Sequence, residues 1–227
     1  MDLKRGVFIT FEGIEGSGKT TQIRKLRVFL QGADCTVIST REPGGTPVAD
    51  MIRDVLLTEH SEKVTDKAEL LLYLASRAQH VHSVIKPALY QGIIVLCDRF
   101  LDATIAYQGY GRGLDIDFLQ KLNRYGTNGL MPDLTILLDL SAEAGIARIR
   151  QGGKRNLDRL ESESIEFHER VRRGYLEIAA SEPERFIVVD GALGEEAIFA
   201  RIKEEVLKRF DLEREKVGRN TAKRELP

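Results

Sequence analysis

The stretch Gly13-Ile14-Glu15-Gly16-Ser17-Gly18-Lys19-Thr20 decides the fold of this chain. It fits the pattern G-x-x-x-x-G-K-[ST], in which glycines let the backbone curl so that successive N–H groups point at phosphate oxygens. A helix expected to begin near Gly18 adds the positive end of its dipole. Lys19 can reach the β- and γ-phosphates of a nucleotide, and the Thr20 hydroxyl can ligate Mg²⁺.

The flanking residues support this interpretation. Residues 7–12 form a short apolar run that predicts a strand, and residues 18–30 have the apolar spacing of a helix. The loop therefore lies between a strand and a helix, as phosphate binding requires, and an ordinary glycine-rich turn is the weaker alternative. A dinucleotide-binding G-x-G-x-x-G loop does not fit, because Gly13, Gly16 and Gly18 lack that spacing.

The rest of the chain alternates strands and helices. Further strands are predicted at 36–40, 93–97, 134–140 and 186–189, and helices at 47–57, 66–90, 162–180 and 195–210, with one more opened by Ser141. Such alternation implies parallel strand pairing. The predicted fold class is α/β: a three-layer P-loop NTPase fold with a central parallel sheet of about five strands, flanking helices and a short lid.

Composition narrows the class of protein. The chain has 227 residues, of which 42% are hydrophobic and 30% charged, values typical of a folded soluble protein. A net charge of −1 argues against a general nucleic-acid binder, and two cysteines are too few for a disulfide framework. No apolar run is long enough to span a membrane. We expect a cytoplasmic protein with one domain over 1–210, a lid at 150–160 and a charged tail over 211–227.

Charged residues follow the second and third predicted strands, where ligands bind in such sheets. Arg41 could clamp a phosphate on an acceptor molecule, or it could be a solvated turn residue. Asp98 is placed to hold Mg²⁺ through water, and Arg99 to neutralise a phosphoryl group in transfer. The alternative is a structural Asp98–Arg99 pair. Asp139 also ends a strand and is the rival metal ligand.

Two predicted helices carry further candidates. Tyr73 and Arg77 lie four residues apart on one face, where they could stack on a base and hydrogen-bond to it. The alternative is a core tyrosine and a surface arginine. Thr104 and Tyr107 could present one polar face of a short helix over 102–108, although plain packing explains them as well.

A Gly- and Arg-rich break follows the helix opened by Ser141. Such a cationic segment could close over the phosphates as a lid and exclude water, or it could be a solvated charge run. Its basic residues are Arg148, Arg150, Lys154, Arg155 and Arg159. The histidines at 60, 80, 82 and 168 lack metal-ligand spacing and are interpreted as surface or structural residues, and Cys97 as an inert core thiol.

The order of motifs resembles the bacterial thymidylate kinases over about residues 7–189. The P-loop is followed by Thr-Arg-Glu-Pro-Gly-Gly-Thr, Asp-Lys-Ala-Glu with Ser-Arg-Ala-Gln, Ile-Lys-Pro-Ala-Leu, Asp-Arg-Phe, Ala-Tyr-Gln-Gly and Leu-Asp-Arg. The resemblance implies phosphoryl transfer from ATP to dTMP with Mg²⁺, a step of dTTP synthesis, and a homodimer. The loop of residues 13–20 would bind ATP.

The resemblance also implies roles for the acceptor-site residues. Arg41 and Arg99 would hold the dTMP phosphate, and Glu15 would face the acceptor sugar or its metal. Thr20 and Asp98 remain the metal ligands expected from the motifs themselves.

Other positions would contact the nucleoside. Tyr73 would lie against thymine, and Arg77 would meet a base carbonyl. Thr104 and Gln108 would contact the base edge. Tyr107 would crowd the sugar 2′ position and so select deoxyribose.

The resemblance further places the catalytic arginine in the lid. Family members carry this arginine either in the P-loop or in the lid, and Gly16 occupies the P-loop position here. The lid of this chain is about two residues longer than the common pattern. We favour Arg155 beside Lys19 and Arg99 as the catalytic set, with Arg150 as the alternate.

Two other functions fit the same scaffold. One is a kinase for another nucleotide or nucleoside, which would differ only in its best acceptor. The other is an ATP-gated switch that changes binding partners and hydrolyses ATP slowly without an acceptor. A guanine-reading N-K-x-D is absent from the sequence, which argues against a GTPase.

Overall fold

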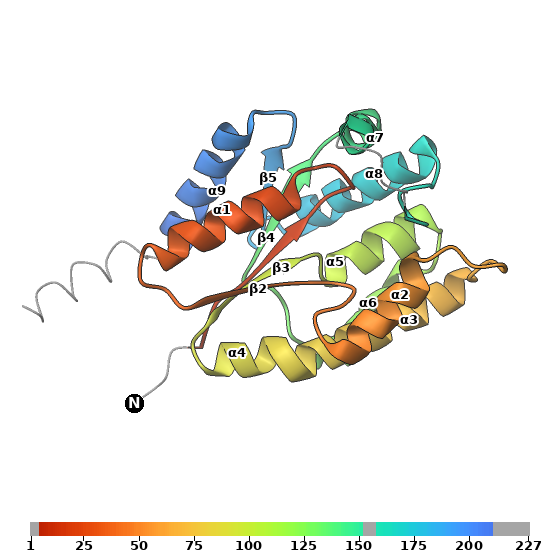
Figure 1. The fold of residues 1–227 in the computed structure, drawn as a ribbon, viewed down its shortest axis with the longest axis horizontal. Coiled ribbons are helices and arrows are strands. Elements are labelled where there is room, and N and C mark those ends of the chain that lie inside the picture. Colours follow the sequence, from red (N-terminus) through yellow and green to blue (C-terminus); the bar gives the residue numbers. More distant parts are fainter. Residues whose placement is uncertain (1–4, 152–157, 211–227) are drawn as a thin grey trace, which may run out of the picture.

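A five-stranded parallel sheet forms the centre of the molecule (Figure 1). A computed structural model describes residues 5–151 and 158–210. All strand pairs are parallel, and the strand order is β2-β3-β1-β4-β5. The strands are β1 (Phe8–Glu12), β2 (Val37–Arg41), β3 (Ile94–Asp98), β4 (Leu134–Asp139) and β5 (Phe186–Asp190). The predicted three-layer α/β fold with a five-stranded sheet is confirmed.

The register of the central strands fixes where a ligand can bind. β1 is buried along its whole length and lies between β3 and β4, with Phe11 opposite both Asp98 and Ile136. On the far side of β3, Arg41 pairs with Asp98. The carboxyl ends of β1, β2 and β3 therefore meet at one edge, and the loops that follow them share a crevice.

Helices cover both faces of this sheet (Figure 1). On one face α1 (Lys19–Gln31) and α9 (Glu195–Phe210) pack together, where Leu26 and Leu30 join Ile202 and Val206 in one apolar cluster with the strands. The other helices are α2 (Pro47–Leu57), α3 (Asp66–His80), η1 (Val81–Ile85), α4 (Lys86–Tyr90), α5 (Leu101–Thr104), η2 (Ile105–Gly111), α6 (Ile116–Thr127), α7 (Ala142–Gln151) and α8 (Ile165–Ser181).

The helix predicted over 66–90 is continuous but changes its winding. Its middle part, η1, is a π-helix, and α4 resumes the α-helical pattern directly after it. Pro87 lacks the N–H that an α-helical turn requires, so a change of hydrogen-bond pattern just before it costs little. Within the described ranges no helix is long and apolar enough to cross a membrane.

Some boundaries differ from the predictions for local reasons. α8 begins at Ile165 rather than at 162, because the Ser164 hydroxyl accepts from Phe167 N at 3.2 Å and caps the helix there. The short helix predicted over 102–108 extends over 101–111 as α5 and η2. α6 was not predicted, although Asp115 caps its start and Asn128 ends it in the left-handed region.

Candidate active site

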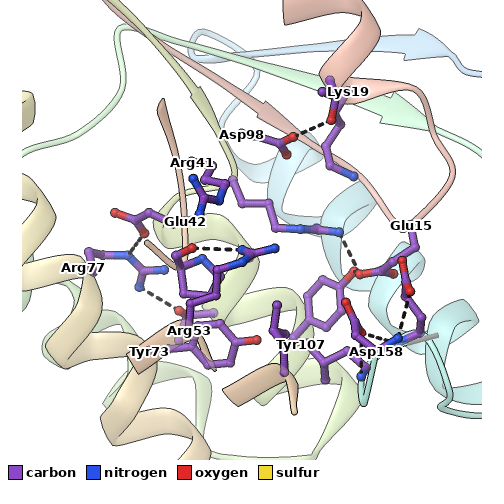
Figure 2. A pocket seen from close by; sticks show the side chains of 18 of the residues that line it. Glu15, Lys19, Arg41, Glu42, Arg53, Tyr73, Arg77, Asp98, Tyr107 and Asp158 are labelled. Atoms are coloured by element: carbon purple, nitrogen blue, oxygen red, sulfur yellow. Dashed lines mark hydrogen bonds and ion pairs between the residues drawn. The ribbon is translucent and has the colours of Figure 1, made fainter. Parts of the chain in front are cut away.

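A cavity of about 340 Å³ opens at the carboxyl ends of β1, β2 and β3. Figure 2 shows Lys19 and Asp98 at the top of this cavity and Tyr73 at its bottom. All of the predicted acceptor-site residues line it: Glu15, Arg41, Tyr73, Arg77, Arg99, Thr104, Tyr107 and Gln108. The fold thus gathers residues from five segments that are far apart in the sequence.

The phosphate-loop glycines are required by backbone geometry. Gly13 and Gly16 have φ values of 130° and 73°, a region that side chains disfavour. A Cβ on Gly13 would lie 2.5 Å from Leu138 O, and one on Gly16 would lie 2.3 Å from Gly145 O. The loop therefore curls tightly between β1 and α1 because neighbouring backbone leaves no room for a side chain.

Lys19 is folded into this loop. Its Nζ donates to the carbonyl oxygens of Gly13 at 3.0 Å and Ile14 at 2.8 Å. Burial and the nearby Arg99 guanidinium lower the pKa of Lys19 to about 8. The ammonium group is therefore held at the loop by backbone dipoles, in surroundings that favour an added negative charge.

The two rival metal ligands have different partners. Asp98 lines the cavity, and its Oδ2 accepts from Thr20 Oγ1 at 3.0 Å. Asp139 instead forms a two-fold hydrogen bond with Arg172, at 2.7 and 3.0 Å. Thr20 and Asp98 together provide the oxygen ligands that Mg²⁺ prefers. Of the two aspartates, Asp98 is thus the one that lines this cavity beside Thr20. No hydrogen bond or ion pair joins Asp98 to Arg99 among the described residues, so the alternative of a structural Asp98–Arg99 pair is wrong.

Arg99 connects the phosphate loop to the acceptor side. Its guanidinium donates to Gly13 O at 2.8 Å, Glu15 Oε1 at 2.8 Å and Tyr175 Oη at 3.1 Å, and it lies 5.0 Å from the Tyr107 ring centroid. Its φ of 68° is left-handed, which costs about 1 kcal/mol in a non-glycine residue. Backbone strain of this kind is concentrated at active sites and ligand-binding positions.

Glu15 is surrounded by donors. Tyr107 Oη donates to Glu15 Oε1 at 2.6 Å, and His168 Nδ1 lies 3.4 Å from Glu15 Oε2. Although burial raises it, the charge of Arg99 and the hydrogen bond of His168 hold the pKa of Glu15 below its usual range. His168 is buried, so the interpretation as a surface residue is wrong for it and the interpretation as a structural residue holds. Sequence reasoning did not predict that it lies beside Glu15.

Arg77 is buried at the part of the cavity lined by Tyr73, Thr104 and Gln108, which we call the base end after the contacts predicted for these residues. Only 1% of it is exposed, so the alternative of a surface arginine is wrong. Its guanidinium donates to Glu42 Oε2, Thr104 Oγ1 and Asn123 Oδ1 at 2.7 Å each, and to Phe100 O at 3.0 Å. Four of its five N–H groups are thus bound by the protein, and one Nη2 hydrogen is left for a ligand.

The side chain of Gln108 is also fixed by a hydrogen bond to another buried residue. Its Nε2 donates to Glu69 Oε1 at 2.8 Å, and Glu69 in turn binds Arg112 and Arg159. Tyr73, on the same helix as Glu69, is half-buried at the cavity wall, and burial raises the pKa of its hydroxyl. At the base end, Arg77 and Gln108 therefore already use most or part of their polar groups in hydrogen bonds to the protein.

Two arginines stand where β2 ends. Arg41 is half-exposed and donates to Asp50 Oδ1 at 3.0 Å. Arg53, which sequence reasoning missed, donates to Pro43 O at 2.9 Å and also lines the cavity. Burial and the neighbouring Arg41 lower the pKa of Arg53. The sequence position of Arg53, twelve residues after Arg41, did not indicate that both side chains line the cavity, because only helix α2 brings the two arginines together.

The predicted lid is partly described. Arg155, the favoured catalytic arginine, lies outside the described residues, whereas Arg150 is an exposed residue of α7. Arg159 donates to Leu56 O at 2.9 Å and pairs with Glu69 at 2.6 Å, so in this structure it is bound by the protein rather than solvated. The alternative of a solvated charge run is therefore wrong for Arg159.

Glu12 lies buried beneath the phosphate loop. Its Oε1 accepts from Phe100 N and its Oε2 from Tyr175 Oη, both at 2.7 Å. Burial, with a smaller contribution from the charge of Asp102, raises the pKa of Glu12 to about 8. Cys97 is also fully buried, and burial raises the pKa of its thiol, as expected of an inert core cysteine.

Comparison with known proteins identifies the family of this chain. The family model described as thymidylate kinase matches residues 11–202. The thymidylate kinase of Trichlorobacter lovleyi is 51% identical over 209 residues, covering 90% of this chain and 98% of the relative. That of Geotalea daltonii is 57% identical over 192 residues, covering 82% and 89%. The crystal structure of thymidylate kinase from Ehrlichia chaffeensis is 34% identical, with a TM-score of 0.73, and covers 89% of this chain and 99% of that one. The chain belongs to the thymidylate kinase family.

Proposed function

We propose that this protein transfers the γ-phosphoryl group of ATP to dTMP, producing ADP and dTDP. One observation carries the proposal beyond family membership. A single cavity joins a phosphate loop with Lys19 to buried base-end residues, Arg77, Thr104 and Gln108. A nucleotide switch needs only the first of these ends, whereas a nucleoside monophosphate kinase needs both.

The donor end would hold the triphosphate. Backbone N–H groups of residues 13–18 and the Lys19 ammonium would bind its phosphates. Thr20 and Asp98 would hold Mg²⁺, and their paired oxygens support this assignment. Bound there, the ion would neutralise phosphate charge during transfer.

The acceptor phosphate would lie between Arg41 and Arg99. It is ionised near neutral pH, so it can attack the γ-phosphoryl group in line with little help from a base. Catalysis then depends on positioning and on neutralising charge. We assign this to Lys19 and Arg99, together with Arg155 of the lid or, as the alternate, Arg150. Arg53 adds a third cation to this wall of the cavity.

The nucleoside would occupy the other end. Tyr73 would lie against the thymine ring, and Arg77, Thr104 and Gln108 would bind its polar edge. Tyr107 would stand against the sugar 2′ position and disfavour ribose. Its hydroxyl is bound to Glu15, which supports a shared role at the sugar.

A panel of acceptors tests the proposal. The protein is incubated with Mg·ATP and, separately, dTMP, dUMP, dCMP, UMP, CMP or thymidine, and ADP is counted for each. We expect dTMP to stimulate ADP formation most. A different best acceptor would indicate another nucleotide or nucleoside kinase, and slow hydrolysis that ignores every acceptor would indicate a switch.

We further propose that the protein is a cytoplasmic homodimer. Helix α3 packs against both α2 and α6, and these three helices carry large exposed apolar side chains, which is unusual for a monomer. Met51 is 64% exposed and Tyr125 is 84% exposed. The apolar side chains on these helices are Val48, Met51, Val55, Leu71, Phe118 and Tyr125. Light scattering should show a dimer that Met51→Glu dissociates, and a monomer at all concentrations would overturn the proposal.

A further inference from the structure

The direction of the Gln108 amide is set by a chemical constraint. The side chain is buried, and its polar neighbour at 2.8 Å is an oxygen of Glu69. A carboxylate can only accept a hydrogen bond, so the NH₂ group of Gln108 must face Glu69. The amide oxygen is then the polar atom left for other partners, and among the described residues we find none that donates to it.

Glu69 is held in its acceptor form. Arg112 donates to both of its oxygens at 3.2 and 3.3 Å, and Arg159 Nη2 lies 2.6 Å from Oε2. Although burial raises it, these hydrogen bonds and that of Gln108 keep the pKa of Glu69 below its usual value. Both guanidinium groups therefore bind Oε2, whereas Oε1 accepts from Gln108 at 2.8 Å and more weakly from Arg112 Nε at 3.3 Å.

The other base-end residues have a fixed polarity as well. Arg77 can only donate, and one Nη2 hydrogen is unused. Thr104 Oγ1 already accepts from Arg77 Nη1, so its own proton remains to be donated. With the oxygen of Gln108, the cavity wall offers two donors and one acceptor. Thymine presents the complement, two carbonyl oxygens and the N3–H donor.

We propose that Glu69 is a positioning residue for base specificity: by binding the NH₂ of Gln108, it makes Gln108 a hydrogen-bond acceptor that selects thymine over cytosine. The inference rests on the proposed dTMP kinase function. Cytosine has a lone pair at N3 and an amino group at C4, so it would place two acceptors or two donors face to face. A buried polar group left unpaired in this way strongly disfavours the wrong base.

Glu69→Gln tests this role. The new amide oxygen would take the Oε2 position, where both arginines donate, so its NH₂ would face Gln108 and lose only the 3.3 Å contact with Arg112 Nε. Gln108 would then turn its oxygen to that NH₂ and present its own NH₂ to the base. We expect the ratio of kcat/KM for dTMP over dCMP to fall about 10- to 100-fold. Turnover of dUMP should fall in parallel with dTMP, because both present the same N3–H edge.

Glu163→Gln is the matched control. Glu163 pairs with the same Arg112, at 2.6 Å, but Gln108 is bound by Glu69, so the ratio should stay at the wild-type value. If Glu69→Gln does not fold, Gln108→Leu tests the inference instead. Loss of the Gln108 amide oxygen must lower the ratio of kcat/KM for dTMP over dCMP without raising dCMP turnover. A wild-type ratio in folded Glu69→Gln, or in Gln108→Leu, overturns the inference. A wild-type protein that ignores dTMP overturns the proposed function instead.

Discussion

The two ends of the cavity are built in different ways. The phosphate end is a continuous stretch, residues 13–20, whose function depends on backbone N–H groups and on glycines that no side chain could replace. The base end is assembled from α3, α5 and η2. The residues proposed to contact the base are side chains that other buried side chains hold in place. The first end is specified locally, and the second depends on long-range packing.

This difference predicts which variants lose activity and which lose stability. At the phosphate end a charged group can be removed with little structural cost, because its partners are backbone carbonyls. At the base end removal of one buried partner leaves another charge unpaired. The predictions below test this contrast, beginning with the largest effect.

Lys19→Ala should reduce turnover by about 10³-fold or more, because the ammonium that neutralises phosphate charge is lost. The melting temperature should not fall below that of the wild type, since burial already disfavours the charged lysine. Steady-state ADP formation and a thermal melt measure both. Near-normal dTDP formation by this variant would remove the phosphate loop from the mechanism.

Arg77→Met should lower the free energy of unfolding by about 3–5 kcal/mol, because Glu42 then remains buried beside His80 without its guanidinium partner. Urea unfolding followed by circular dichroism measures the loss. Changing both partners, Arg77→Met with Glu42→Gln, should recover part of it. A single variant as stable as the wild type would contradict the view that the base end is held by paired charges.

Glu12→Gln should change how stability depends on pH. Between pH 4.5 and about 8 the folded protein keeps a proton on Glu12 that the unfolded chain releases. Stability from this group is therefore complete below pH 4.5 and is lost as pH rises to about 8, by up to about 1.4 kcal/mol per pH unit. Glutamine carries no such proton. When the free energy of unfolding is measured from pH 5 to 8, the value for the variant should rise relative to that of the wild type. Parallel pH dependences of the two proteins would refute the raised pKa.

Arg41→Ala should have the smallest structural effect. Arg41 and Asp50 are both more than two-fifths exposed, and such pairs contribute about 0–1 kcal/mol. The KM for dTMP should nevertheless rise several-fold, while the KM for ATP stays unchanged. A large loss of stability would show that this arginine belongs to the buried network rather than to the ligand surface.

Much of the site was predictable because its signals are local. The phosphate loop, the strand before it and the helix after it follow from glycine conformations and apolar spacing over fewer than thirty residues. Arg41 and Asp98 were predictable because the carboxyl ends of parallel strands meet at one edge of the sheet. The resemblance to a known family supplied Tyr73, Arg77, Thr104 and Gln108.

Other features were decided only by tertiary structure. Asp98 and Asp139 end the two strands on either side of β1, and only the packing of α8, which brings Arg172 to Asp139, distinguishes them. The burial of Arg77 depends on partners from the loop after β2, from α5 and from α6, and the contact between Glu69 and Gln108 depends on how α3 lies against η2. The sequence by itself determined the sheet, the phosphate loop and its chemistry, because backbone geometry and hydrophobic periodicity act over short distances. Which face of each polar side chain remains for a ligand was decided by the folded structure, because that depends on partners distant in the chain.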